Sequence, residues 1–305
     1  TPSNSSAASD VYKRQGYMSP NFERLFIKNI YGTNLQRAVV WVALADYVTI
    51  QNIYGENIIG NDATDEGEVV SVESGTVPII ENVTGINTPK AILMLSGGTR
   101  ALVKNIRGST QQDGIRIKSG YDFMISKVCI LCNTNLGSGA ETKGIYIVNT
   151  DDAIRRIQME QINIRNFDNG IYVKAGSTNH HKKIILSQTK IETAGKAVYL
   201  ENVDDFKILS GMFINTNVDV DATNSTYEIK NVIGYLTENS GTATISSSTS
   251  VTFAHGLAGT PTHVQIGWKD TGYGDWKWSA DDTNITITVT NSGTYNFSWY
   301  AEYKP

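Results

Sequence analysis

The sequence has few cysteines, no long apolar run and no excess of positive charge. No window approaches the roughly 18 consecutive apolar residues that a membrane-spanning helix needs, so we expect no membrane span. The 26 Lys and Arg residues are scattered and stand against 30 Asp and Glu residues, which gives a formal net charge of -4. Proteins that bind nucleic acid through its phosphates concentrate basic residues on one surface. Nucleic acid is therefore not an expected partner.

Cysteine and histidine are too sparse to indicate a metal site. Cys129 and Cys132 are the only cysteines, and residues three apart on a strand point to opposite faces. We interpret them as structural thiols, since free cysteine usually packs as a small apolar group. His180 and His181 lie in a polar insertion, where an adjacent pair is typically solvated, and His255 and His263 flank a turn. Their spacing provides no set of three or four ligands, so we predict no transition metal.

The first fifteen residues do not read as part of a fold. The stretch SSAASDVYKRQ at 5–15 resembles a translated adapter sequence that recurs at the ends of metagenomic reading frames. We expect residues 1–15 to be an assembly artefact or disordered, and the natural protein to extend further upstream.

From about residue 24 to residue 236 the sequence repeats a phrase of two parts. The first part is a short apolar stretch that often follows Gly or Ala, and the second follows after a turn. Examples of the first are Val69–Val72, Ala91–Met94, Gly114–Ile117, Gly144–Ile147, Gly170–Val173 and Ala197–Leu200. Examples of the second are Tyr47–Gly55, Val77–Gly85, Ala101–Gly108 and Lys183–Ile191. Copies recur every 22 to 34 residues or so, the period of one supersecondary unit.

These phrases predict strands that stack as coils. They alternate with period 2 and are rich in β-branched residues, and no helical stripe runs through the region. One coil cannot bury its apolar face alone, so each strand must pair with its counterpart about 4.8 Å away in the next coil. We therefore predict an all-β fold, a right-handed parallel β-helix of roughly eight or nine coils. Its extra residues fall at 56–68, 133–143 and 174–182, which are candidate binding loops.

The pattern changes near residue 239. Six alternating stretches separated by turns rich in Gly, Pro and Asp predict a small antiparallel β-sandwich. They are Thr244–Ser246, Ser250–Leu257, Thr262–Trp268, Asp275–Trp278, Asn284–Val289 and Tyr295–Glu302. The predicted domains are thus 16–238 for the β-helix and 239–305 for the sandwich.

Two sets of motifs carry a resemblance to known families. The recurrent Gly-Ile-Tyr-Ile and Asn-Ile-x-Gly phrases resemble parallel β-helix proteins of the pectate-lyase-like and phage tail-spike kind. The segments Val251–Thr262 and Phe297–Glu302 resemble a lectin-like module at the end of phage tail fibres. The resemblance implies a homotrimer at a virion or extracellular surface that binds, and in some members cleaves, polysaccharide.

One outward residue per coil is expected to form a column along the β-helix. Aligning the first strands gives Val40, Ser71, Leu93, Arg116, Tyr146, Tyr172, Tyr199 and Asp219. Neighbours in such a column are about 4.8 Å apart. Tyrosine offers an apolar face with a polar tip on which sugars stack, although it also simply suits a pleated surface. Tyr146, Tyr172 and Tyr199 are therefore candidate carbohydrate-binding residues.

Trp268, Tyr273, Trp276 and Trp278 are further candidates for carbohydrate binding. Trp276 and Trp278 share one face of a strand by period 2. That face could be an exposed sugar platform or part of the sandwich core.

Catalysis on a polysaccharide would need acidic groups in one groove. Glycoside hydrolases use two carboxylates, and the resemblance implies that a lyase would use carboxylate-bound calcium. Asp113 and Asp168 stand at nearly equivalent positions before Gly-Ile strands, about 10 Å apart by strand spacing, with Arg116 close to Asp113. Asp before Gly is also an ordinary turn former.

Three functions therefore remain open. The first is a glycan-recognising tail spike, adhesin or fibre tip without a cofactor. The second is a polysaccharide lyase or glycoside hydrolase that uses Asp113, Asp168 and Arg116, with calcium only in the lyase case. The third is a purely structural fibre segment.

Overall fold

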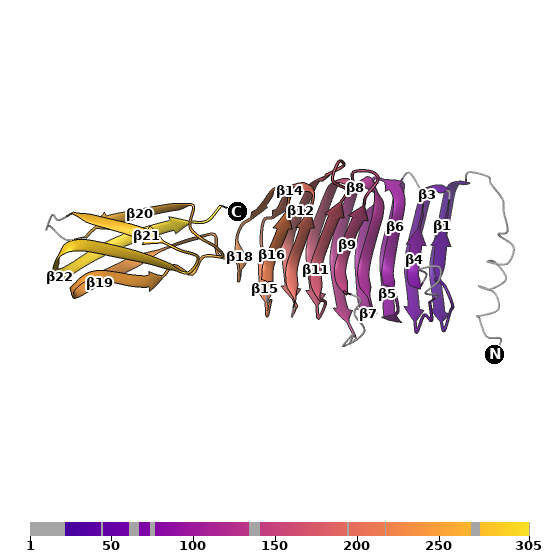
Figure 1. The fold of residues 1–305 in the computed structure, drawn as a ribbon. Helices are drawn as coiled ribbons and strands as arrows, with labels where there is room; N and C mark the ends of the chain where they lie inside the picture. Colours follow the sequence, from indigo (N-terminus) through magenta and orange to yellow (C-terminus); the bar gives the residue numbers. More distant parts are fainter. Residues whose placement is uncertain are drawn as a thin grey trace. The chain divides into compact units, whose positions relative to one another are not determined.

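The structure is a computed structural model that describes residues 22–43, 45–60, 67–73, 77–133, 141–193, 195–216, 218–269 and 275–304. All regular structure in these ranges is β-strand (Figure 1). The parallel strands are β1 (Phe22–Thr33), β2 (Val40–Val42), β3 (Ala45–Glu56), β4 (Glu68–Val72), β5 (Val77–Thr88), β6 (Ala91–Thr99), β7 (Leu102–Thr110), β8 (Asp113–Cys132), β9 (Lys143–Asn149), β10 (Arg155–Arg165), β11 (Asn169–Ala175), β12 (His181–Glu192), β13 (Lys196–Glu201), β14 (Val203–Ile208), β15 (Gly211–Ile214), β16 (Val218–Thr223), β17 (Tyr227–Ile229) and β18 (Val232–Ile233). The antiparallel strands are β19 (Glu238–Ala254), β20 (His263–Trp268), β21 (Trp276–Ala280) and β22 (Asn284–Glu302).

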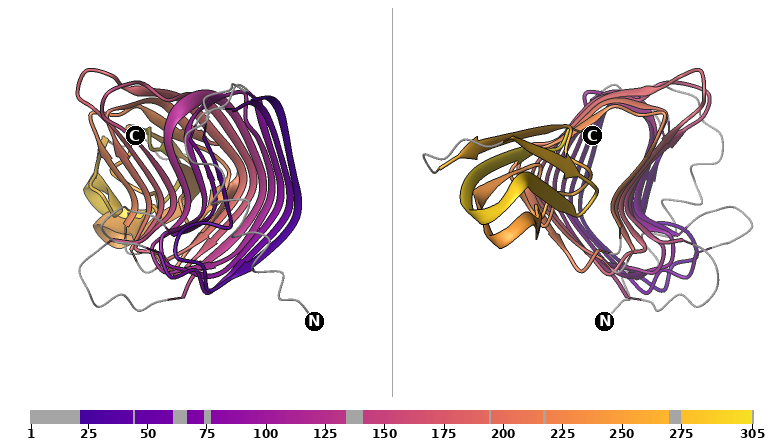
Figure 2. Two further views of the ribbon diagram at one scale, coloured as in Figure 1. Left: turned by 90° about the vertical axis from the view of Figure 1, so that its right-hand side faces the viewer. Right: turned by 60° about the vertical axis from the view of Figure 1, so that its left-hand side comes forward.

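Strands of successive coils pair in parallel, as the repeat predicts. One inward column runs through β3, β5, β7, β8, β10 and β12, and its members pair directly with one another: Ile50, Ile80, Val103, Ile125, Met159 and Leu186. All of these side chains are buried. The result is a parallel β-solenoid of about eight turns, whose stacked coils are visible in Figure 2. The predicted fold class is confirmed.

Asparagines hold bends within β1, β3, β5 and β7. Asn29, Asn52, Asn82 and Asn105 all have φ near +57°, a conformation that Asn tolerates better than most residues. Their side-chain amides form a ladder: Asn52 Nδ2 donates to Asn29 Oδ1 (2.8 Å), Asn82 to Asn52 (2.9 Å) and Asn105 to Asn82 (2.8 Å). The recurrent Asn-Ile-x-Gly phrase therefore encodes a turn and its own stabilising hydrogen bonds.

The glycine of that phrase is required by close backbone packing. Gly85 and Gly108 pair with each other in β5 and β7. Gly108 has φ +136°, and a Cβ there would lie 1.7 Å from the carbonyl oxygen of Gly85. No other residue fits at this position.

The second part of the fold is a four-stranded antiparallel sheet in the order β19-β22-β20, with β21 also on β22. Four strands replace the six predicted because β19 and β22 each run through two predicted stretches. Phe253 and Trp299 have ring centroids 5.1 Å apart, yet Phe253 pairs with Ile285, fourteen residues from Trp299. A straight strand would separate these residues by about 45 Å. The sheet therefore folds over on itself, and its two halves enclose one core in the manner of a sandwich.

The chain divides into two compact units. One comprises Thr1–Lys207 with Phe213–Thr226, and the other Ile208–Met212 with Tyr227–Pro305. The antiparallel sheet of the second unit begins at Glu238. The predicted domain limits of 16–238 and 239–305 stay a prediction.

Candidate functional site

Three tyrosines and an arginine form one column on the solenoid, which we call the tyrosine strip: Arg116, Tyr146, Tyr172 and Tyr199. They come from β8, β9, β11 and β13, which pair directly with one another. Each tyrosine stands between two buried apolar neighbours on its strand. The alternation in Gly-Ile-Tyr-Ile and its relatives thus directs the third residue of each phrase outward, as predicted.

The prediction is wrong at three other positions of the column, those given to Val40, Leu93 and Asp219. The register gives the full column as Trp41, Ser71, Met94, Arg116, Tyr146, Tyr172, Tyr199 and Asp221. Val40 and Leu93 are buried core residues, and the residue of the column is the next one along the chain in each case. At Asp219 the prediction is two residues away from the residue of the column, Asp221. All five residues of Ala91–Leu95 are apolar and buried. Such a strand has no alternation from which its outward face can be identified.

The rings of the strip pack on one another. Tyr172 and Tyr199 stack with centroids 4.4 Å apart and planes 11° from parallel. Tyr146 meets Tyr172 edge to face, with centroids 5.4 Å apart. A sugar ring has no space between stacked rings at this distance. The strip therefore presents ring edges and hydroxyl groups outward rather than a row of open faces.

Cationic side chains cover part of the remaining ring surface. Lys143 Nζ lies 5.0 Å from the centroid of Tyr146 and 5.1 Å from that of Tyr172. Lys196 Nζ lies 4.9 Å from the centroid of Tyr199. Positive groups at these distances are attracted by the negative face of the ring. Each of the three tyrosine rings thus has a lysine ammonium group close to it.

Carboxylates complete a hydrogen-bonded network beside the rings. The Tyr199 hydroxyl donates to Glu201 Oε2 at 2.8 Å, and Lys174 Nζ lies 2.7 Å from the same oxygen. Lys196 Nζ lies 2.7 Å from Asp221 Oδ2. The hydrogen bond to Glu201 raises the pKa of Tyr199, and the hydrogen bond from Lys174 lowers the pKa of Glu201. These side chains are therefore held in place, with Tyr199 neutral and Glu201 ionised at neutral pH.

Asp113 and Arg116 form a buried ion pair at one end of the strip. Arg116 Nε donates to Asp113 Oδ2 at 2.9 Å, and its Nη2 lies 2.7 Å from the same oxygen. Asp113 is 1% exposed. Burial and the Asp113 carboxylate both raise the pKa of Tyr146. Asp113 and Arg116 lie close together, as predicted. Arg116, however, already binds one oxygen of the Asp113 carboxylate.

Asp168 has a structural role in the turn before β11. Its Oδ2 accepts from Thr142 N (2.8 Å) and Thr142 Oγ1 (3.0 Å), and its own N–H donates to Thr142 Oγ1 at 2.8 Å. Asn169, rather than Asp168, is the register equivalent of Asp113, with Lys143 in the coil between them. The two carboxylates thus occupy different columns, and their catalytic role stays a prediction.

The histidines do not form the solvated pair expected from the sequence. His181 is fully buried, and its Nδ1 accepts from Ile154 N at 3.1 Å. Burial lowers its pKa to about 4. His180 Nδ1 lies 3.0 Å from Asp204 Oδ1. The insertion at 174–182 therefore packs on the coils beside it.

His255 and the cysteines occupy structural positions. His255 Nδ1 accepts from Leu257 N (3.0 Å), and its Nε2 lies 3.1 Å from the carbonyl oxygen of Asp281. These bonds hold the turn after β19. Cys132 is buried as expected, whereas Cys129 is exposed.

The tryptophans of the antiparallel unit divide between core and surface. Trp268 and Trp276 pack against the core, with ring centroids 4.6 Å and 6.2 Å from that of Phe297. Trp278 is 43% exposed. The predicted Tyr273 lies outside the described residues. Only Trp278 of this set presents a large free surface among the residues described.

Sequence reasoning missed the lysines and acids beside the tyrosines: Lys143, Lys174, Lys196, Glu201 and Asp221. Lys143 and Lys196 precede their tyrosines by three residues, and Lys174 and Glu201 follow theirs by two. That repeated spacing was the available signal.

Neither a metal-binding cluster nor a membrane-spanning helix is found in the described ranges. No cluster of three or more His, Cys, Asp or Glu residues within them could hold a metal ion. No helix there has the length and apolarity to cross a membrane.

Comparison with known proteins gives distant structural matches. No protein-family model and no curated protein matches the sequence. The solenoid is similar to the tailspike protein gp49 of Pseudomonas phage LKA1, with 10% identity, a TM-score of 0.31 and coverage of 92% of this chain and 67% of that chain. It is also similar to the tailspike gp49 of Acinetobacter baumannii bacteriophage Fri1, a capsular polysaccharide depolymerase, with 6% identity, a TM-score of 0.18 and coverage of 92% and 70%. The predicted likeness to tailspike solenoids is found, but no activity follows from values this low.

Proposed function

We propose that this chain is a glycan-recognising surface protein, of the tail-spike, adhesin or fibre-tip kind, which binds a polysaccharide along the tyrosine strip. A location on a virion or outside a cell and a homotrimeric state belong to this proposal. The observation that carries it is the column itself. Three tyrosines on consecutive coils, with three lysines and two carboxylates beside them, form a continuous surface of amphipathic rings and hydrogen-bonding groups.

The stacked geometry indicates how a glycan would be held. The stacked rings of Tyr172 and Tyr199 cover one face of each other. Sugar hydroxyls would therefore bind to the tyrosine hydroxyls, Lys174 and Glu201. Sugar C–H groups would contact the edges of the rings. Sugars present both kinds of group, and aromatic side chains with a polar tip are suited to both. Recognition would therefore depend more on hydrogen bonds than on ring stacking.

The network also lowers the entropic cost of binding. Immobilising a flexible side chain at an interface costs about 0.5–1.5 kcal/mol. Lys174, Glu201 and Tyr199 are already fixed by one another. A surface ordered in advance can bind a polar ligand without this cost.

The experiment follows retention of the purified chain on a panel of bacterial and plant polysaccharides, and the appearance of new chain ends. Tyr172→Ala should abolish retention on the bound polysaccharide, because it removes the central ring. Tyr47→Ala is the matched control, since Tyr47 is also an exposed tyrosine on a strand but lies outside the strip. Equal loss in both variants would contradict the proposal.

A polysaccharide lyase or hydrolase is the second candidate, because the Asp113–Arg116 pair adjoins Tyr146. New chain ends that disappear in Asp113→Asn or Asp168→Asn would establish the enzyme instead. Absence of both retention and cleavage would leave the structural fibre segment as the account.

A further inference from the structure

A hollow of about 550 Å³ lies on the solenoid away from the tyrosine strip. Side chains of β7, β8, β10 and β12, together with Arg100 and Ala101 just before β7, line it. Binding pockets for small molecules commonly have volumes of about 300–1,000 Å³, apolar walls and a few polar groups. The hollow falls within this range.

Apolar side chains form the floor of the hollow. Leu102 pairs with Met124, and Gln158 pairs with Met124 on one side and Ile185 on the other. Leu102 is 38% and Met124 57% exposed. Apolar side chains this exposed gain free energy when a ligand removes them from water, at about 25 cal/mol per Å².

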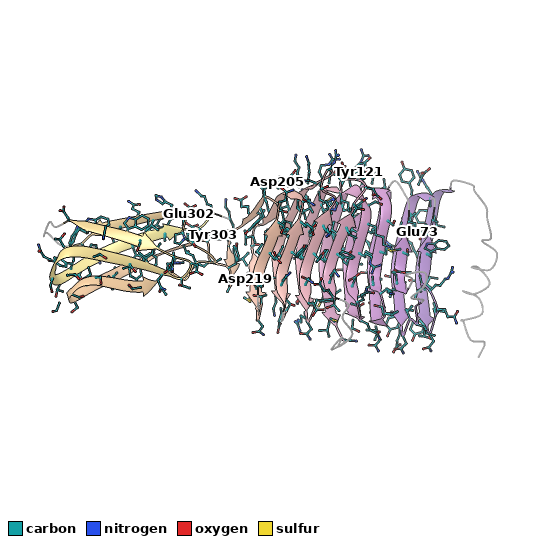
Figure 3. All side chains as sticks on the ribbon, viewed as in Figure 1. Glu73, Tyr121, Asp205, Asp219, Glu302 and Tyr303 are labelled. Atoms are coloured by element: carbon teal, nitrogen blue, oxygen red, sulfur yellow. The ribbon has the colours of Figure 1, made fainter. Side chains whose placement is uncertain are left out.

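Charged residues of one bend form the rim. Arg100, Asp122, Arg156 and Lys183 all have φ between 56° and 62°. They occupy corresponding positions on successive coils, just before β7 and within β8, β10 and β12. Because the chain turns at each of them, their side chains stand beside the apolar column. The rim therefore carries three cations and one carboxylate in a single row. In Figure 3, Tyr121, next to this bend, lies at the upper edge of the solenoid.

The one acid on the rim orients an arginine. Arg156 forms a fork with Asp122, to which both Nε and Nη2 donate, and its guanidinium lies 5.6 Å from the centroid of Tyr121. The hydrogen bond from Arg156 lowers the pKa of Asp122. Asp122 therefore stays ionised, and the remaining positive charge of the rim comes from Arg100 and Lys183.

We propose that this hollow binds a carboxylate joined to an apolar group, with the carboxylate on Arg100 and Lys183 of the rim and the apolar group on Leu102 and Met124. Arginine and lysine form their strongest hydrogen bonds with anions, and the floor selects a ligand with an apolar substituent. A short-chain fatty acid and an acetylated acidic sugar both have this chemistry. The site is independent of the glycan-binding role of the tyrosine strip.

Methionine methyl NMR tests this directly, because Met124 is the exposed methionine on the floor while Met94 and Met159 are buried. The probes are hexanoate and N-acetylneuraminate, compared with glucuronate, which lacks the apolar group, and hexanamide, which lacks the charge. Met124→Leu assigns the Met124 resonance. We expect hexanoate, N-acetylneuraminate or both to shift this resonance at concentrations at least fivefold below those of the comparison compounds. The probe that binds identifies the source.

Charge variants complete the test. Arg156→Gln should weaken binding of the active probe at least fivefold, because it leaves the Asp122 carboxylate uncompensated beside the two cations that bind the anion. Arg165→Gln, an exposed arginine of the same strand, should leave it within twofold. A Met124 resonance unmoved by both carboxylates, or moved equally by glucuronate or hexanamide, would overturn the proposal. So would equal effects of the two arginine variants. Tyr172→Phe should leave this binding intact, so failure here and failure of the glycan proposal are distinguishable.

Discussion

Tyr172 and Tyr199 stack face to face on adjacent coils, with ring centroids 4.4 Å apart. This distance is close to the strand spacing of a parallel sheet, so the solenoid itself sets the stack. The hydroxyl of Tyr199 is fixed on Glu201. The strip is therefore a rigid surface whose outward chemistry is hydroxyl, ammonium and carboxylate.

Arg116→Ala should destabilise the solenoid by about 3–5 kcal/mol, because it leaves the buried Asp113 carboxylate without its partner. The double variant Arg116→Met/Asp113→Leu removes both charges and should recover much of this loss. Urea unfolding at pH 7 measures both. If the single variant costs under 1 kcal/mol, as is usual for exposed pairs, the pair is not the buried ion pair described.

Asn82→Ala should cost about 2–4 kcal/mol, from two lost ladder hydrogen bonds and from placing alanine at positive φ. Asn82→Gly loses the same hydrogen bonds without the backbone strain, and should cost about 1 kcal/mol less. The midpoint of urea unfolding gives this order. Equal costs would mean that the backbone conformation at Asn82 contributes nothing.

His181 should make the solenoid less stable in mild acid. Its pKa in the folded chain is about 4, against 6.5 for an ordinary histidine side chain, so between these values the unfolded chain binds a proton that the folded chain excludes. Stability then falls as the pH decreases through this window, by about 2 kcal/mol between pH 7 and pH 5.

The free energy of unfolding at the two pH values measures this change. His181→Asn should flatten the dependence, because the titrating group is gone. His263→Asn, which removes an exposed histidine, should leave it unaltered. An unchanged slope in His181→Asn would show that another group causes it.

Trp276 and Trp278 should behave differently although they share a strand face. Trp276→Ala removes a ring packed against Phe297 and should destabilise the antiparallel unit by about 2 kcal/mol, less than the 3–5 expected for a fully buried ring. Trp278→Ala should cost under 1 kcal/mol. Thermal unfolding of the two variants decides this, and equal losses would place both rings in the core.

The sequence predicts the solenoid and the centre of the strip well, because Gly-Ile-Tyr-Ile and its relatives alternate cleanly. The prediction fails at Leu93, where a wholly apolar strand conceals its outward face. It also fails to show that β22 folds over, since no local signal at 290–294 distinguishes a bend from the turn between two strands. The roles of Lys143 and Glu201 depend on side-chain directions that spacing alone does not determine.

The most direct test of the glycan-binding account is the affinity of the retained polysaccharide for Tyr172→Phe/Tyr199→Phe, measured against Tyr47→Phe. The double variant keeps the stacked rings and removes only two hydroxyls, one of them bound to Glu201. The account predicts at least a tenfold loss of affinity in the double variant and none in the control. Unchanged affinity in the double variant would show that the strip does not hold the glycan.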